Sequence, residues 1–387
     1  MKNRTQTAIK ILGDLVSFKT LSGLSNLEMI GYVEGYLRDE GIPAHLSYDE
    51  TGERANIHAF IGPPVDGGVV LNGHTDVVPA DGQSWTSNPF ILRENQGRLY
   101  GRGAVDMKGF LACMLASIPA WKAKPMKVPI HISMCYDEEI GGFGAPILVA
   151  DMEQTAPHPA VAIVGEPTNM KIITGHKGGF EMRTTVSGFE AHASDPRKGV
   201  SAISYAVKFI SYLEKIASDL AQNARADSSF DPPYTTINTG AIHGGTARNI
   251  IAGTCVFDWE LRPIPEDNGD ELIEKIHAFA ELELLPAMQK TSPNAKIETE
   301  MQARVPALDQ TTAQAASTLL REITGLNSTN VVAFATDAGH FCNAGISTAV
   351  FGPGSIEQAH KPDEFIEISE VEACLDFLDQ LGDRLCQ

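Results

Sequence analysis

The sequence predicts an α/β protein in which a domain built on a mostly parallel sheet is interrupted by a smaller α+β domain. Apolar runs of strand length alternate with amphipathic helical segments over roughly the first 180 residues, a pattern typical of helices that cover a parallel sheet. The pattern then changes to alternating strands and long helices, and the first pattern returns towards the C-terminus. With 387 residues, the chain is also long enough for more than one hydrophobic core.

The first α/β segment opens with two amphipathic helices. They have the sequences TAIKILGDLVSF and NLEMIGYVEGYLRDEG, and Gly41 and Pro43 end the second. A further helix is expected from Met107 to Ile118. Apolar runs predict the strands of the sheet at Ala55–Ile61, Val69–Asn72, Pro129–Cys135 and Ala160–Val164.

The middle of the chain, residues 179–293, is predicted to form the inserted domain. Strands that are apolar on alternate residues and two long helices are expected in it, an arrangement typical of a small α+β unit. The strands are predicted at Phe180–Ser187, Thr235–Ile242 and Gly253–Leu261, and the helices at Ser201–Ala224 and Asp267–Gln289.

The α/β pattern resumes after Pro293, so residues 1–178 and 294–387 are predicted to form a single domain. Its later elements are a helix near Thr312–Thr324, strands at Val331–Ala335 and Ser347–Phe351, and a C-terminal helix over Ile368–Leu385.

The composition argues against several classes of partner. Acidic residues outnumber basic ones by 49 to 30, and the resulting net charge of −19 repels nucleic acid and anionic membranes. No apolar stretch reaches the length of a membrane span, and the N-terminus does not resemble a secretion signal. Six cysteines without paired spacing indicate reduced thiols. We therefore expect a cytoplasmic protein that binds neither nucleic acid nor a membrane.

Histidine and acidic residues follow four of the predicted strands. Because ligands of open α/β sheets bind outside the carboxyl ends of the strands, we expect these side chains to converge on one crevice. Asp106 joins them at the start of a predicted helix. The residues that follow the strands are His74, Glu138, Glu139, Glu166 and His360.

Two imidazoles together with several carboxylates indicate a zinc site, since Zn²⁺ accepts both kinds of ligand. The charges indicate two ions rather than one. The carboxylates of Asp106, Glu139 and Glu166 balance two Zn²⁺ ions and one bridging hydroxide, whereas a single ion would leave carboxylates that repel one another. Asp106 is the candidate to bridge two ions separated by ~3.5–4 Å.

Two further carboxylates have expected roles beside this site. Asp76 follows His74 at the spacing of a carboxylate that orients a ligating histidine through its second ring nitrogen. Adjacent side chains diverge, so Glu139 can bind a metal while Glu138 faces the water and acts as a general base.

Other catalytic motifs fit the sequence poorly. The segment GRGAVDMKG superficially resembles a dinucleotide-binding loop, but Asp106 occupies the place of the third glycine, and no convincing strand precedes the segment. The chain has no G-x-S-x-G elbow and no cysteine in a recognisable nucleophile motif, so a covalent hydrolase is not favoured.

Five motifs in this order resemble those of the M20 metallopeptidase family: GHTDVVP, GRGAVDMKG, the DEE run, GEPT and GPGSIEQAHKPDEF. The resemblance covers nearly the full length. It implies a zinc-peptidase-like catalytic domain, here residues 1–178 and 294–387, that binds two Zn²⁺ ions, for which Co²⁺ can substitute. It also implies that residues 179–293 form an inserted dimerisation domain.

The resemblance further implies a role for individual residues. Glu138 is implied as the general base, and His192 as a histidine that crosses a homodimer interface to bind the developing oxyanion. A non-proline cis bond is implied between Asp106, the bridging ligand, and Met107. The implied metal ligands are His74, Asp106, Glu139, Glu166 and His360.

Further segments, GHKG at residues 175–178 and HASDPRKGVSAI at 192–203, resemble members of the family that act on small N-acyl amino acids. The implied reaction removes the acetyl group from N2-acetyl-L-ornithine, a step of arginine biosynthesis. Arg262 is the candidate for the substrate α-carboxylate, because a guanidinium group binds a carboxylate through two hydrogen bonds. Asn249 is expected at the same end of the substrate, and Asp337 at a distal ammonium group.

Two alternatives remain open. One is a related deacylase such as a succinyl-diaminopimelate desuccinylase, or a carboxypeptidase. The other, from a different class, is a non-catalytic zinc-binding scaffold. The presence of Glu138 beside a full set of ligands favours an enzyme, because metal binding alone needs no general base.

Overall fold

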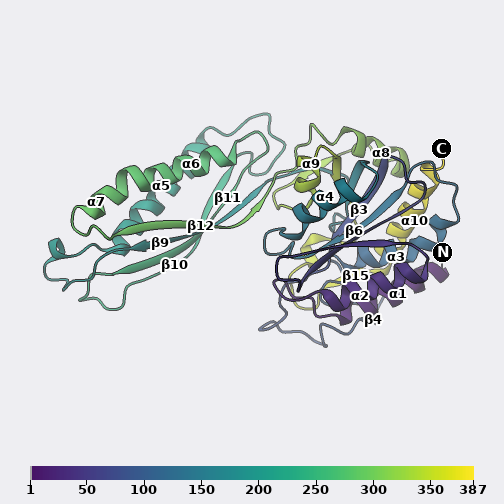
Figure 1. The fold of residues 1–387 in the computed structure, drawn as a ribbon, viewed down its shortest axis with the longest axis horizontal. Coiled ribbons are helices and arrows are strands. Elements are labelled where there is room, and N and C mark those ends of the chain that lie inside the picture. The colour runs from purple at the N-terminus through teal and green to yellow at the C-terminus, as the bar shows by residue number, and fades with distance from the viewer. Residues whose placement is uncertain (1) are drawn as a thin grey trace. The chain divides into compact units, whose positions relative to one another are not determined.

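The computed structural model describes residues 2–387, which form two compact units (Figure 1). The chain up to Gly175 begins unit 1, and the polypeptide returns to it after a long insertion that forms unit 2. Unit 1 also contains Leu308–Val331 and Thr336–Gln387, and unit 2 contains His176–Ala307 and Val332–Ala335.

The second boundary of the insertion follows Ala307 rather than residue 293. The difference arises because Lys296–Val305 forms strand β12, which we did not predict, and β12 pairs with β9 (Gly179–Ser187) of unit 2. The short return of residues 332–335 to unit 2 was also not predicted, since Val331–Ala335 was expected to be a strand of the main sheet. Strand β13 covers only Asn330–Val332.

The described part of unit 1 is built on an eight-stranded sheet with the order β1-β2-β6-β3-β7-β14-β8-β13. The ladders that join β6, β3, β7 and β14 are parallel, and β1, β2 and β8 pair antiparallel towards the edges. The strands, besides β13, are β1 (Ala44–Tyr48), β2 (Ala55–Ile61), β3 (Gly68–His74), β6 (Ile130–Cys135), β7 (Pro159–Val164), β8 (Ile173–His176) and β14 (Ser347–Val350).

Helices cover both faces of this sheet (Figure 1). Helix α3 packs on β2 and β3 and also contacts α1 and α10, whereas α4 and α9 contact each other and lie on the side away from α1 and α3. The helices are α1 (Lys2–Ser17), α2 (Leu27–Asp39), α3 (Lys108–Lys122), α4 (Gly144–Thr155), α8 (Gln314–Thr324), α9 (Ala338–Asn343) and α10 (Ile368–Arg384). A small sheet, β15-β5-β4, joins Phe365–Glu367, Arg98–Tyr100 and Arg93–Asn95.

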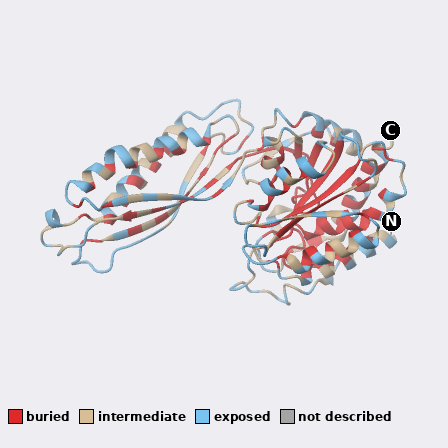
Figure 2. Cartoon of the chain, viewed as in Figure 1, coloured by how far each residue is buried: buried red, intermediate tan, exposed pale blue. Residues whose placement is uncertain are grey.

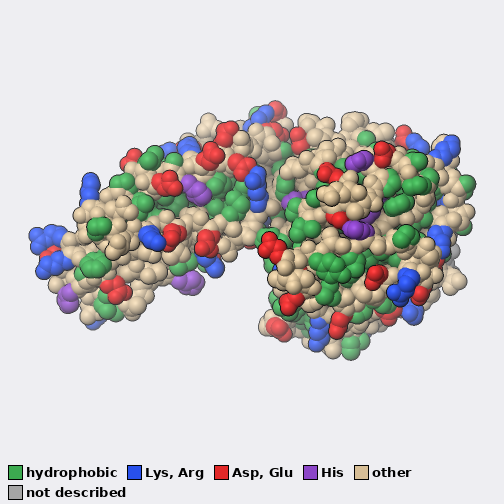
Figure 3. Space-filling model, viewed as in Figure 1, with side chains coloured by type: hydrophobic (Ala, Val, Ile, Leu, Met, Phe, Trp, Pro, Cys, Tyr) green, Lys and Arg blue, Asp and Glu red, His purple; other side chains and the backbone are tan. Residues whose placement is uncertain are grey.

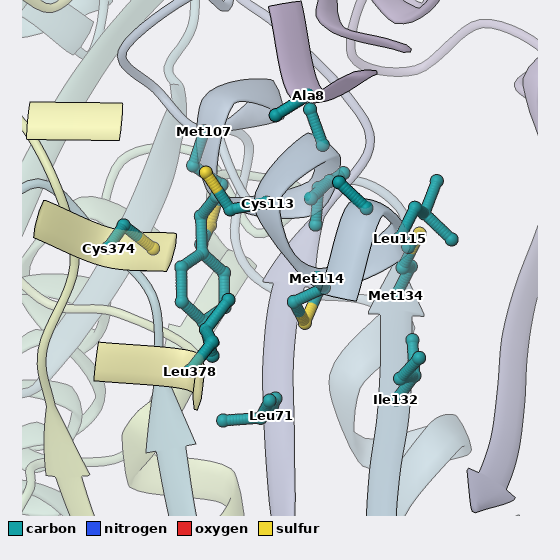
Figure 4. Close-up of a cluster of buried hydrophobic side chains, with 14 of the residues drawn as sticks. Ala8, Leu71, Met107, Cys113, Met114, Leu115, Ile132, Met134, Cys374 and Leu378 are labelled. Carbon is teal, nitrogen blue, oxygen red and sulfur yellow. The ribbon is translucent and has the colours of Figure 1, made fainter. Parts of the chain in front are cut away.

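The core of unit 1 is formed by its central strands and by helix α3. Strands β3 and β6 are buried at every residue, because helices cover both faces of the sheet (Figure 2). Helix α3 is buried from Lys108 to Ile118, with Cys113 towards helix α10 and Met114 towards the sheet residue Leu71 (Figure 4). Its first residue, Lys108, donates to the carbonyls of Leu15 and Phe18 at the end of α1.

Unit 2 is a four-stranded antiparallel sheet, in the order β10-β11-β9-β12, with helices on one face. Burial alternates along β9 and β11, so that one face of the sheet packs on the helices and the other faces solvent (Figure 2). Its other elements are β10 (Thr236–Gly244), β11 (Thr254–Arg262), α5 (Ala202–Gln222), α6 (Gly269–Phe279), a π-helical turn (Ala280–Leu284) and α7 (Leu285–Gln289). Single 3-10 turns occur at Pro196–Lys198 in unit 2 and at Ile356–Gln358 in unit 1.

The fold class predicted from the sequence is confirmed, with an α/β unit and an α+β insertion. The six cysteines, all within the described residues, are free. None of the helices formed by residues 2–387 combines the length and the apolar character that a bilayer span requires.

Candidate metal centre and active site

The ends of neighbouring parallel strands place the candidate ligands at one edge of the sheet. His74 is the last residue of β3, Glu138 and Glu139 follow β6, and Glu166 follows β7. Because β6, β3 and β7 are adjacent and parallel, their carboxyl ends lie side by side. The loops that precede α3 and follow β14 add Asp106 and His360, so the structure brings the five predicted ligands together.

Asp106 lies between the two histidines. One carboxylate oxygen, Oδ1, is 3.0 Å from His74 Nε2, and the other, Oδ2, is 3.3 Å from His360 Nε2. Glu166 Oε1 lies 3.6 Å from His74 Nε2, and Glu139 Oε2 lies 2.8 Å from His360 Nε2. The arrangement therefore has two sides that share Asp106, which is the geometry expected of a bridging carboxylate.

The donor atoms also lie close enough to hold an ion. Among the described residues, His74, Asp106 and Glu139 have ligand atoms within 4.8 Å of one another. The same holds for His74, Glu138 and Glu166. The second group contains Glu138, the predicted base, so this carboxylate lies at the cluster and not on a solvated face.

The acidic side chains of the cluster destabilise one another's charge. Burial, together with the charge of Glu166, raises the pKa of Glu138 well above its usual range. Burial and the charge of Asp106 raise the pKa of Glu139 to about 7 and that of Glu166 well above its usual range. The cluster thus concentrates more negative charge than its surroundings neutralise.

The histidines respond in the opposite direction. Burial alone would lower the pKa of His74, but hydrogen bonds to Asp106 and Asp76 raise it well above its usual value. Hydrogen bonds to Asp106 and then Glu139 raise the pKa of His360 to about 10. Burial opposes ionisation of Asp106, yet its bonds to His360 and His74 leave its pKa below the usual range. In the protein without metal, protons on the histidines therefore supply part of the missing positive charge.

A divalent cation fits this donor set. Glu166 Oε1 is buried and accepts no hydrogen bond from any described residue, since His74 Nε2 lies 3.6 Å away, although buried carboxylate oxygens normally accept one. Imidazole nitrogens and carboxylate oxygens are both ligands of zinc and related metals. A pair of such ions would supply the charge that the three glutamates and Asp106 lack.

Asp76 connects the histidine to the two glutamates. The His74 ring nitrogen Nδ1 lies 3.0 Å from the carbonyl oxygen of Asp76 and 3.5 Å from its Oδ1. The carboxylate also accepts the backbone N–H groups of Glu138, at 3.1 Å, and Glu139, at 3.3 Å, and the hydroxyl of Ser22, at 2.7 Å. The shorter contact to the ring is thus the main-chain carbonyl of Asp76, whereas its carboxylate faces the same nitrogen at 3.5 Å and binds the backbone of the Glu138-Glu139 pair.

The backbone around these residues is held in specific conformations. Asp137 has a left-handed φ of +56°, and its carboxylate accepts the N–H of Gly23 at 2.7 Å and forms an ion pair with Arg54. The peptide bond between Asp106 and Met107 is cis, as the family resemblance implies.

Three of the predicted substrate residues lie in unit 2. His192 and Asn249 are neighbours there, since the N–H of Ala193 donates to the carbonyl of Asn249 at 2.9 Å, and both side chains are exposed. Arg262 is the last residue of β11, and its guanidinium group binds Glu260 on the same strand, with Nη2 2.8 Å from Oε2.

Asp337 lies in unit 1 and is only 1% exposed. Its Oδ2 accepts the Cys135 thiol with an Sγ–O distance of 2.7 Å, and burial raises its pKa to about 6. The prediction that Asp337 contacts a distal ammonium group finds no support in this placement, because the carboxylate faces the core and not an open surface.

Sequence reasoning missed a set of polar side chains around the ligands. Glu364 and Arg102 form a buried ion pair beneath the loop of Asp106, and Gln83 binds the carbonyl of His360. Glu364 is part of the motif GPGSIEQAHKPDEF, but its partners are distant in sequence, so only the folded chain identifies them. Ser22, which binds Asp76, carried no signal at all.

Comparisons with known proteins identify the family and agree with this fold. Residues 70–384 match the family model described as peptidase family M20/M25/M40. Over 393 aligned residues the chain is 33% identical to an acetylornithine deacetylase of Erwinia tasmaniensis, and the alignment covers 100% of both sequences.

Two solved structures show the same fold at lower identity. An M20 family metallo-carboxypeptidase from Sulfolobus solfataricus superposes with a TM-score of 0.74 at 17% identity, covering 100% of both chains. A dinuclear metal-binding M20 peptidase from Bacillus subtilis superposes with a TM-score of 0.67 at 16% identity, covering 99% of this chain and 98% of the other. The chain therefore belongs to peptidase family M20/M25/M40 and is a hydrolase of that family.

Proposed function

We propose that this protein is a metal-dependent amidohydrolase that removes the acetyl group from N2-acetyl-L-ornithine, giving L-ornithine and acetate. Metal-dependent hydrolysis is supported above all by the position of Asp106 between His74 and His360, with Glu138 at the same cluster. The substrate comes from the full-length similarity to an acetylornithine deacetylase. The reaction would serve arginine biosynthesis in the cytoplasm.

The five residues His74, Asp106, Glu139, Glu166 and His360 are the proposed ligands of two Zn²⁺ or Co²⁺ ions. Bound there, the ions would polarise the acetyl carbonyl. They would also lower the pKa of the attacking water, so that it loses a proton readily near neutral pH. Glu138 takes the proton from the attacking water and returns it to the nitrogen that leaves as the amine. Asp76 holds Glu138 and His74 in place during these proton transfers.

His192 is the proposed donor to the oxyanion that develops on the substrate. The backbone N–H of Ser194 points at Nδ1 of His192 with an N–N distance of 3.2 Å, so Nδ1 is the acceptor nitrogen of the ring. The Ser194 hydroxyl lies 2.8 Å from the same nitrogen, so Nδ1 is engaged within its own loop and Nε2 is the nitrogen proposed to donate to the substrate. A donor placed at an oxyanion contributes ~3–4 kcal/mol to transition-state stabilisation.

Arg262 and Asn249 are the proposed contacts of the substrate α-carboxylate. Arg262 ends β11, whereas the loops of His192 and Asn249 lie near the start of that strand, where the N–H of Gly188 donates to the carbonyl of Gly253. At ~3.3 Å per residue, a strand of 9 residues separates its two ends by about 25–30 Å. An N-acyl amino acid is much shorter. In this proposal Arg262 therefore contacts the substrate from one subunit, and His192 with its neighbour Asn249 contacts it from the partner subunit.

An exposed apolar surface on unit 2 supports a homodimer. Ile203 and Val207 lie one turn apart on α5 and are 38% and 50% exposed, and Ile242 on the adjacent edge strand β10 is 47% exposed. Figure 3 shows hydrophobic side chains exposed among charged ones on the helical side of this unit. An open strand edge beside an apolar helix face suits a two-fold contact between copies. Val207→Glu should therefore yield monomers in analytical ultracentrifugation, and Leu282→Glu, at a residue 72% exposed, should leave the dimer intact.

The test of the reaction is the Glu138→Gln variant. It should bind both metal ions but lose at least ~10²–10⁴-fold in turnover of N2-acetyl-L-ornithine, because a positioned proton acceptor is removed. The matched control is Glu322→Gln, which removes an exposed carboxylate that pairs with Arg384. Retention of most activity by Glu138→Gln would overturn its assignment as the base.

A substrate panel separates the proposed reaction from its alternatives. The acetyl, succinyl and peptide derivatives of the same amino acids are compared at matched concentration. If the protein prefers the succinyl derivative or a peptide, its reaction is that of a desuccinylase or a carboxypeptidase of the same family. A protein that binds two metal ions and hydrolyses none of them would instead be a scaffold.

Subunit complementation tests the shared active site. His192→Ala and Glu138→Gln subunits are each inactive, but a mixed dimer has one site with an intact base and an intact histidine. Random pairing of equal amounts should restore about a quarter of the wild-type rate. A mixture that remains inactive after subunit exchange has been demonstrated would refute the shared site.

A further inference from the structure

A single buried carboxylate, that of Glu364, organises the loop that carries Asp106. Its side chain is 1% exposed and accepts three backbone N–H groups of this loop. The distances are 3.0 Å from Gly103, 2.9 Å from Val105 and 3.2 Å from Asp106 itself. The convergence of these N–H groups requires the left-handed φ of +79° at Gly103. Glu364 thus fixes the main chain of Asp106 directly.

The same carboxylate is joined to the main chain of His360. Glu364 Oε2 lies 2.7 Å from Nη1 of Arg102, which is also 1% exposed. Arg102 Nη2 donates to the side-chain oxygen of Gln83 at 2.6 Å, and Gln83 Nε2 donates to the carbonyl of His360 at 2.9 Å. We call Glu364, Arg102 and Gln83 the polar bridge. It connects the two segments that carry Asp106 and His360.

The segment of His360 needs such support. His360 and Asp363 have left-handed φ values of +62° and +53°, which are unfavourable for residues other than glycine. The His360 side chain is 52% exposed, so packing does not hold it. Its conformation depends on bonds to other loops, including those from the Thr86 N–H and hydroxyl to Asp363, at 3.0 and 2.9 Å.

We propose that the polar bridge sets the separation of Asp106 and His360, and thereby the affinity of one of the two metal positions. The inference rests on the proposed ligand set. His360, Glu139 and one oxygen of Asp106 form the affected position, whereas His74 and Glu166 on the other side are held by β3 and β7. Glu364 contacts neither substrate nor metal in this scheme, so it is a positioning residue.

The test measures metal binding and not turnover. Metal-free wild type, Glu364→Gln and Gln83→Ala are titrated with Co²⁺ in the presence of a competing chelator, and the visible absorption gives two dissociation constants. In Gln83→Ala one constant should rise about 10–100-fold, the usual effect of losing a group that orients a ligand, and the other should stay close to wild type. In Glu364→Gln, which also releases the main chain of the shared ligand Asp106, the same constant should rise most and the other should rise less. Excess metal should restore turnover in Gln83→Ala.

The matched control is Glu370→Gln. Glu370 is a partly buried carboxylate that, like Glu364, accepts a backbone N–H, here that of Gly354 at 2.9 Å, but it does not bind the loop of Asp106. Circular dichroism establishes that each variant is folded. If Glu364→Gln does not fold, the metal affinities of Gln83→Ala alone test the proposal, because Gln83 lies outside the core.

Unchanged constants in the folded variants would overturn the proposal. An equal loss of Co²⁺ affinity at both metal positions would also overturn it, as would the same loss in Glu370→Gln. Either result would indicate that the whole site has become less rigid. A wild type that binds fewer than two ions would overturn the ligand set and this inference together. A wild type that binds two ions but does not hydrolyse N2-acetyl-L-ornithine would contradict only the proposed substrate.

Discussion

Replacement of Asp76 by Asn changes one carboxylate oxygen to an NH₂ group in a side chain that contacts four other polar groups. Oδ1 accepts the N–H of Glu138 and faces Nδ1 of His74, and Oδ2 accepts the hydroxyl of Ser22 and the N–H of Glu139. Asparagine keeps one oxygen and places an NH₂ group at the other site. The favoured orientation keeps the oxygen at Oδ1, because the Ser22 hydroxyl can rotate to accept from the new amide, whereas a backbone N–H cannot.

The N–H of Glu139 then faces a donor. A partly buried donor left without an acceptor costs about 1–3 kcal/mol. The main chain of Glu138 and Glu139 should shift to relieve this loss, which displaces the proposed base and one proposed ligand. At ~1.4 kcal/mol per factor of ten, we expect kcat/KM to fall roughly 5- to 150-fold in Asp76→Asn.

The assay compares kcat/KM for N2-acetyl-L-ornithine and Co²⁺ affinity between wild type, Asp76→Asn and Ser22→Ala. Ser22→Ala removes one donor and leaves both backbone N–H groups paired, so it should lose less than about fivefold. If Asp76→Asn stays within threefold of wild type in both quantities, or if the two variants lose the same amount, the role given to Asp76 is refuted.

Two further predictions concern stability. Burial, and for His58 also the neighbouring His131, lowers the pKa values of these residues to about 3 and about 4, and each is neutral in the folded protein at pH 7. In the unfolded chain each histidine has a pKa near 6.5 and takes up a proton below that pH, whereas in the folded protein it stays neutral. The free energy of unfolding should therefore be unaffected by these histidines above pH 6.5 and should fall by about 2 kcal/mol per histidine between pH 6.5 and pH 5. Urea unfolding of the metal-free protein at pH 7 and pH 5 should therefore show a smaller acid loss in His58→Phe, and an equal loss would contradict the assignment. Gly165→Ala would place a Cβ 2.0 Å from the Phe110 ring, next to Glu166. We expect it to lower the free energy of unfolding by about 1–3 kcal/mol and to weaken metal binding, and wild-type stability would show that Phe110 can move without cost.

The part of the site that sequence could predict depends on topology. Apolar strands followed by His or acidic residues predict convergence, because parallel strands end at one edge of the sheet. His74, Glu139 and Glu166 follow this rule directly. Asp76, two residues beyond the end of β3, lies beside His74 because the sequence distance between them is short.

Other features depend on contacts that no local pattern contains. Strand β12, KIETEMQARV, is mostly exposed and highly polar, so its apolar pattern is weak, and only pairing with β9 defines it. Glu364 binds N–H groups 258 to 261 residues away, which sequence spacing cannot reveal. The direction of the Asp337 side chain into the core is likewise decided by packing around Cys135.

The most direct test of the proposed chemistry is ornithine release from N2-acetyl-L-ornithine as Zn²⁺ is added back to the metal-free protein. If both proposed positions are needed, the rate should rise with added metal, reach its maximum at two ions per subunit and disappear again with excess chelator. Release that is the same with and without metal, or no release from a folded protein that has bound two ions, would contradict the proposed reaction.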